Sequence, residues 1–130
     1  MILVAYNGSP EARRALLHAA DLVGAGGRLA VVNVIPSQFI SARLETVSDA
    51  ERRQQDRLLA DAKSLLSERG VEMQAIAVAG DPVTEIRAAA ERSGADILVV
   101  GQKQGARHLI HSSVSKRLIR RAPSDVLVVH

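Results

Sequence analysis

The stretch Met1-Ile-Leu-Val-Ala-Tyr-Asn-Gly-Ser-Pro10 decides the fold of this 130-residue chain. Its first six residues form a short, continuously apolar run, which is typical of a strand that is covered on both faces. Ser9 then offers a helix N-cap, and Pro10 suits the first helical position. A buried strand that leads directly into a helix is the repeating unit of parallel α/β proteins.

The same unit recurs along the rest of the sequence. Apolar runs predict four more strands, at Leu29–Ile35, Val71–Ala79, Asp96–Val100 and Val126–Val129. Helix starts are predicted at Ser9, at the capping box of Ser48 and Glu51, at Asp81-Pro82, and at Ser112 or Ser113. The apolar stripe of the first helix consists of Ala12, Ala15, Leu16, Ala19, Leu22 and Val23. This alternation predicts an α/β protein with an open parallel five-stranded sheet and helices on both faces.

Composition narrows the function classes. The chain has no cysteine, which removes disulfides, thiolate metal sites and cysteine nucleophiles. Tyr6 and Phe39 are its only aromatic residues, too few for a platform that stacks nucleic-acid bases. The net charge of +3 is small, and no apolar run approaches the roughly 18 residues of a membrane span. We therefore expect a cytoplasmic protein with neither a membrane nor a nucleic acid as its partner.

Two loops follow strands at the place where open parallel sheets bind ligands, beyond the carboxyl ends of the strands. One loop is Ala5–Ser9, and the other is Gly101–Ser115. Their glycines permit a close approach of the backbone to a ligand, and the hydroxyls at the start of the last helix can hold phosphate. Ordinary turn and cap chemistry explains the same residues, and both interpretations stay open.

Several site types are missing from the sequence. It contains no P-loop, no G-x-S-x-G elbow and no G-x-G-x-x-G fingerprint. His108 and His111 stand three residues apart without an evident third ligand, so no metal site is expected. No general base is evident beside the second loop, so we expect no catalytic residue.

Three groups of residues together resemble the universal stress proteins over essentially the whole chain. They are Ile2–Pro10, then Gly80-Asp81-Pro82 with Gly94–Gly101, and finally Ser113-Val-Ser115 with Arg121-Ala-Pro123 and Val126–Val129. The resemblance implies one domain over residues 1–130 with strand order 3-2-1-4-5, a Rossmann-like arrangement. It also implies homodimers and, in one branch of the family, binding of ATP with Mg²⁺.

The second loop departs from the pattern of that branch, which is G-x2-G-x9-G-[ST]. Gly101 and Ser113 match it, but Gln104 and Ser112 replace two glycines, Gly105 comes one position late, and the loop is two residues shorter. The family's acidic residue that holds the ribose is Asn7 here. These departures predict weak or altered ATP binding, or its loss. Donors and positive charge nearby compensate in part, and they come from Lys103, Arg107, His108 and His111.

The resemblance implies that the following residues contact the nucleotide where it binds, with Val34 near the adenine: Ala5, Asn7, Val34, Gly101, Gly105, Ser112, Ser113, Val114 and Ser115. We therefore expect a small stress-response protein in which an adenine nucleotide acts as a switch. The alternative is a dimeric interaction module of the same fold that binds no nucleotide.

The last strand supports the dimer from its own residues. Val126–Val129 is apolar on both faces and would lie at a sheet edge, which invites pairing with a second chain unless a loop or helix covers it. The role of Ser37–Asp56 stays open, because Phe39 and Ile40 suit a lid, a partner contact or inward packing.

Overall fold

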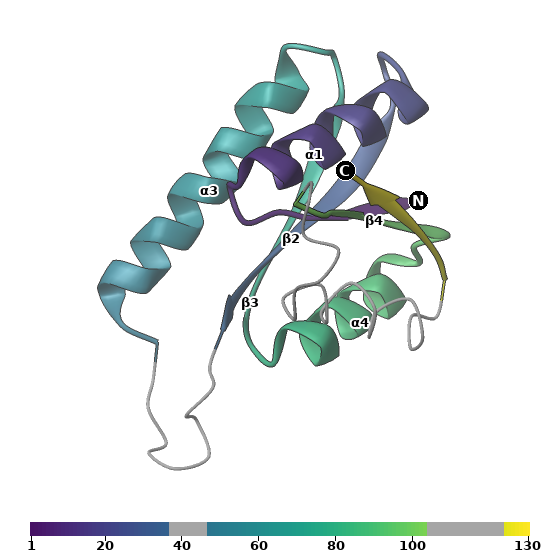
Figure 1. The fold of residues 1–130 in the computed structure, drawn as a ribbon. Helices are drawn as coiled ribbons and strands as arrows, with labels where there is room; N and C mark the ends of the chain where they lie inside the picture. Colours follow the sequence, from purple (N-terminus) through teal and green to yellow (C-terminus); the bar gives the residue numbers. More distant parts are fainter. Residues whose placement is uncertain (37–46, 104–123) are drawn as a thin grey trace.

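The computed structural model describes residues 1–36, 47–103 and 124–130 (Figure 1). Within them lies one parallel sheet of five strands in the order β3-β2-β1-β4-β5. The strands are β1 (Ile2–Ala5), β2 (Arg28–Pro36), β3 (Glu72–Gly80), β4 (Ile97–Gly101) and β5 (Asp125–Val129). The fold class and strand order expected from the sequence are confirmed, and each strand end lies within one residue of its expected position.

Three helices connect the described strands, and each begins where its capping residues predict. They are α1 (Pro10–Val23), α3 (Asp49–Ser67) and α4 (Pro82–Ser93). Ser9 caps α1, the capping box of Ser48 and Glu51 opens α3, and Asp81 caps α4 by accepting from the Thr84 N–H at 3.0 Å. The helix expected after Ser112 falls within 104–123, outside the described residues.

The helices cover opposite faces of the sheet, with α1 and α3 on one side and α4 on the other (Figure 1). Alternation along β1 shows why both faces are apolar. Val4 packs into the core under α1 and α3, whereas Leu3 packs into the core under α4, and neither is exposed. Because successive strand residues point to opposite faces, a continuous apolar run serves two cores at once.

One member of the predicted stripe of α1 does not join the core. Leu22 is 54 % exposed, whereas Leu16 and Ala19 are fully buried. At 3.6 residues per turn, Leu22 lies about 120° around the helix from Leu16, while Val23 lies only about 20° away from it. Val23 packs against the core in the last turn, so the expectation that Leu22 is buried was wrong.

Candidate functional site

The strand order reverses at the middle of the sheet. Val4 of β1 pairs with Val31 of β2 on one side and with Val99 of β4 on the other. The segments that leave β1 and β4 therefore start from neighbouring strands, at the edge formed by the carboxyl ends, here called the carboxyl edge. This is the position at which open α/β sheets bind ligands. Asn7 and Lys103 belong to these two segments, and Gly105 lies outside the described residues.

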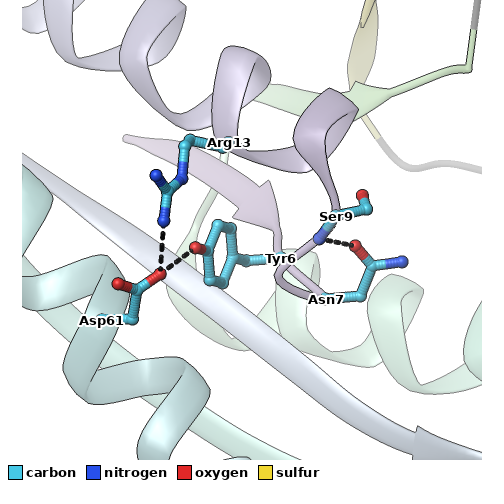
Figure 2. A network of polar contacts seen from close by, with 5 residues as sticks. All are labelled: Tyr6, Asn7, Ser9, Arg13 and Asp61. Atoms are coloured by element: carbon cyan, nitrogen blue, oxygen red, sulfur yellow. Dashed lines mark hydrogen bonds and ion pairs between the residues drawn. The ribbon is translucent and has the colours of Figure 1, made fainter.

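The segment after β1 is a compact turn held by its own side chains. The Ser9 N–H donates to Asn7 Oδ1 at 3.0 Å (Figure 2). The Ala12 N–H donates to Ser9 Oγ at 3.1 Å. Gly8 has a φ of 82°, and a Cβ added to it would stand 2.5 Å from Leu58 Cδ2. The turn therefore requires glycine at position 8 and fixes the direction of the Asn7 side chain.

Gly101 ends β4 against the start of α1. A Cβ added to it would overlap the carbonyl group of Glu11 and stand 2.8 Å from the backbone nitrogen of Ala12. Since backbone atoms cannot move aside cheaply, this packing alone requires glycine. Gly101 matches the family pattern, but in the described structure its contact is with the helix.

Ala5 and Val34 share one face of the sheet. Both are partly buried and pack against the core under α4, together with Val100. They come from neighbouring strands, so they form an apolar surface beside the Asn7 turn. The other predicted site residues, Gly105, Ser112, Ser113, Val114 and Ser115, lie outside the described residues.

A tyrosine anchors the end of β1 on the opposite face. The Tyr6 hydroxyl donates to Asp61 Oδ2 at 2.5 Å, and Arg13 Nη2 lies 3.4 Å from the same oxygen (Figure 2). Tyr6 is 2 % exposed. Burial raises the pKa of Tyr6 to about 12, with the hydrogen bond and charge of Asp61 adding to the rise and Arg13 opposing it. The hydroxyl therefore stays protonated at neutral pH and joins β1 to α3.

A buried pair of amides joins three strand ends to α3. Asn33 Nδ2 donates to the Tyr6 carbonyl at 2.8 Å, and Gln55 Nε2 lies 2.9 Å from both the Asn33 carbonyl and the Val78 carbonyl. Gln55 also reaches Asn33 Oδ1 at 3.1 Å, and both amide side chains are 4 % exposed. Since buried amides without partners are costly, this set fixes the relative positions of β1, β2 and β3 at the carboxyl edge.

Neither the Tyr6–Asp61 contact nor the Asn33–Gln55 pair was predicted from the sequence. Asn33 interrupts the apolar run of β2, and Gln55 lies four residues before Leu59, on the buried side of α3. A polar residue at a core position is a recognisable signal. The partner of such a residue, however, is distant in sequence: Asn33 and Gln55 lie 22 positions apart, and Tyr6 and Asp61 lie 55 positions apart.

The described residues show neither a metal site nor a membrane span. Nowhere in residues 1–36, 47–103 and 124–130 do three His, Asp or Glu side chains gather as a metal site would require. His108 and His111 lie outside these ranges. Of the helices in the same ranges, none has both the length and the hydropathy needed to cross a membrane.

Comparison with known proteins gives the family. The model of the universal stress protein family matches residues 1–130. A universal stress protein of Mycobacterium tuberculosis is 30% identical over 139 residues, which cover 99% of this chain and 94% of the relative. The crystal structure of a family protein from Burkholderia pseudomallei is 31% identical with a TM-score of 0.77, covering 98% of this chain and 93% of that one.

Two solved structures that contain nucleotides share the fold. A universal stress protein in complex with cAMP has a TM-score of 0.76 at 20% identity, covering 99% of this chain and 95% of that one. The Arabidopsis thaliana protein with AMP bound has a TM-score of 0.71 at 22% identity, covering 98% of this chain and 89% of that one. With the family model matching the whole sequence and the sheet in the expected order, the chain belongs to the universal stress protein family.

Proposed function

We propose that this protein binds an adenine nucleotide at the carboxyl edge of β1 and β4, with an affinity or ligand preference that differs from ATP binding in the family. The observation that carries the proposal is the reversal of strand order beside the Asn7 turn. Support comes from the two family proteins of the same fold that were solved with cAMP and with AMP.

The chemistry of the described residues fits such a ligand. Ala5 and Val34 offer a partly buried apolar surface that suits the adenine ring. Asn7 is exposed and suits the ribose. Gly105 and residues Ser112–Ser115 would hold the phosphates, as the family pattern implies, with Mg²⁺ accompanying a triphosphate.

Calorimetric titration with 5′-AMP and with Mg·ATP tests the proposal, using the guanine nucleotides as ligand controls. We expect binding of the adenine forms and a higher melting temperature in their presence. Mass spectrometry of the freshly purified, denatured protein checks for nucleotide carried through purification. No heat signal, no melting shift and no recovered nucleotide would together contradict the proposal.

A matched pair of variants locates the site. Ala5→Leu adds bulk at the carboxyl edge, whereas Ala95→Leu adds the same bulk to the same core just before β4, at the opposite edge. We expect Ala5→Leu to weaken nucleotide binding about tenfold and Ala95→Leu to leave it unchanged, because only the first occupies the proposed adenine surface. Equal effects would place the site elsewhere.

The alternative is a dimeric interaction module that binds no nucleotide, and β5 is the feature that favours it. Val126 and Val128 pack on one core and Leu127 and Val129 on the other, all only partly buried at the end of the sheet. We propose a homodimer through β5, since an apolar edge strand favours pairing. Recovery of ATP or ADP in near-equal amount would refute the version without nucleotide.

Sedimentation and hydrogen exchange test the dimer itself. A dimer should show twice the 13.9 kDa mass of the chain, and amides of residues 125–129 should exchange more slowly as the protein concentration rises. Exchange that is independent of concentration, together with the mass of a single chain, would rule out pairing through β5.

We propose that the protein is cytoplasmic. We also propose that it has no catalytic residue, so that it hydrolyses ATP slowly at most. Ser113 is the hydroxyl residue that matches the family pattern. A turnover assay in which Ser113→Ala and the wild type give the same background would exclude even slow hydrolysis.

A further inference from the structure

The orientation of the Asn7 side chain is fixed by its own turn. The Ser9 N–H can only donate, so the atom that faces it at 3.0 Å must be the amide oxygen. The amide nitrogen then lies on the other side, away from Ser9 and Tyr6 (Figure 2). Within the described parts of the chain, no group accepts a hydrogen bond from Asn7 Nδ2. The carboxyl edge therefore presents an N–H donor at this point.

The carboxylates at this edge are engaged within the fold, and Asp81, which follows β3, caps α4 by accepting from the Thr84 N–H. Asp61 Oδ2 is already shared by Tyr6 and Arg13 on the face under α3. Lys103 follows the end of the neighbouring strand β4 and is exposed. A neutral donor at an edge that also carries a cation suits an anionic oxygen better than a neutral hydroxyl oxygen, because charge-assisted hydrogen bonds are roughly twice as strong as neutral ones.

We propose that Asn7 makes the site select adenine nucleotides that carry a phosphoryl group on the 2′ or 3′ oxygen of the ribose, over those with a free ribose diol. This inference rests on the proposed function, because it takes the ribose to lie beside Asn7. Asn7 Nδ2–H donates to a charged phosphoryl oxygen, whereas a ribose hydroxyl that accepts the same hydrogen bond is neutral and gains less from it.

The substitution Asn7→Asp isolates this feature. One carboxylate oxygen can accept from the Ser9 N–H and keep the turn, while the second replaces the outward donor with a charged acceptor. Asn7→Ala removes the donor without changing the charge, and it also removes the oxygen that accepts from the Ser9 N–H. The comparison of these two variants therefore separates hydrogen bonding from general electrostatic attraction.

Titration calorimetry of the wild type should compare 5′-AMP with adenosine 2′,5′-bisphosphate and adenosine 3′,5′-bisphosphate at constant ionic strength. We expect one bisphosphate to bind about tenfold more tightly than 5′-AMP, as expected for one hydrogen bond to a charged group. Asn7→Ala should reduce that ratio about tenfold, and Asn7→Asp should invert it in favour of 5′-AMP.

The outcomes separate the two proposals. Wild-type protein that binds all three nucleotides equally, or a ratio that neither variant changes, overturns the role of Asn7 and leaves nucleotide binding standing. Failure of every ligand to bind overturns the proposed function and this inference with it. Should either variant fail to fold by circular dichroism, the wild-type ratio and the remaining variant decide the result.

Discussion

At the carboxyl edge, one face of the sheet is built from paired polar side chains and the other from apolar side chains. Under α3, the side chains of Tyr6, Asn33 and Gln55 are buried, and each is hydrogen-bonded within the molecule. On the side of α4, Ala5 and Val34 are apolar and only partly buried. Buried polar groups that pair with one another hold the elements that carry them in fixed relative positions. The first face thus holds the strand ends in place, and the second carries the apolar residues of the proposed site.

Gln55→Leu tests the first face most severely. It removes the donor that serves the Asn33 side chain and the Val78 carbonyl, which leaves buried acceptors without a partner. We expect a loss of about 3 kcal/mol in the free energy of unfolding, measured by urea denaturation. Gln54→Leu is the control, since Gln54 is exposed on the same helix. We expect this variant to lose less than about 0.5 kcal/mol in the free energy of unfolding. Similar losses in the two variants would show that the buried amides are not an anchor.

Gly101→Ala tests the packing between β4 and α1. The added Cβ meets the Glu11 carbonyl group, so the helix start or the strand end must shift. We expect a loss of about 2 kcal/mol in the free energy of unfolding. Gly94→Ala serves as control, because nothing lies within 4 Å of its added Cβ and only its φ of 66° opposes the change. We expect Gly94→Ala to lose about 1 kcal/mol in the free energy of unfolding. A loss at Gly101 no larger than this would mean that its glycine is not required by packing.

Tyr6→Phe tests the hydroxyl that joins β1 to α3. It removes the hydrogen bond to Asp61, whose half-exposed carboxylate can turn to water instead. We expect a loss of about 1 kcal/mol in the free energy of unfolding at neutral pH. An unchanged stability would show that the short contact with Asp61 contributes nothing net.

The same variant predicts a pH dependence. The pKa of Tyr6 is raised from 10.0 to about 12, so the hydroxyl contributes fully below pH 10 and its contribution is lost as the pH rises toward 12. The difference in stability between wild type and Tyr6→Phe should therefore shrink over this interval, because phenylalanine does not titrate. Chemical denaturation at a series of alkaline pH values measures it, and a constant difference would contradict the raised pKa.

Ser112→Gly gives the smallest expected effect and concerns the binding side. Ser112, which lies outside the described residues, replaces a glycine of the family pattern, and we expect its Cβ to hinder the approach of the backbone to phosphate. Its removal should raise ATP affinity about fivefold, equivalent to relief of about 1 kcal/mol. Titration calorimetry measures this change. An unchanged affinity would assign the weak binding to the shorter loop instead.

Much of the fold was predictable because its signals are local. The starts of α1, α3 and α4 each depend on residues within three positions of one another, as Ser48 and Glu51 show. The carboxyl edge of β1 and β4 was also expected, although the strand order came from the family resemblance. Of the predicted contacts, the structure brings Ala5 and Val34 to one face, and the placement of the nucleotide itself stays a prediction.

The sequence by itself determined the alternation of strands and helices, since apolar period and capping are written in neighbouring residues. Only the tertiary structure decided which polar groups pair and which stay free. Tyr6 meets Asp61, Asn33 meets Gln55 and Gly101 meets Glu11 because strands and helices cross in space. Such contacts join distant parts of the chain, and no local pattern encodes them. The outward direction of the Asn7 amide nitrogen follows from the same cause, because the folded turn directs its oxygen toward Ser9.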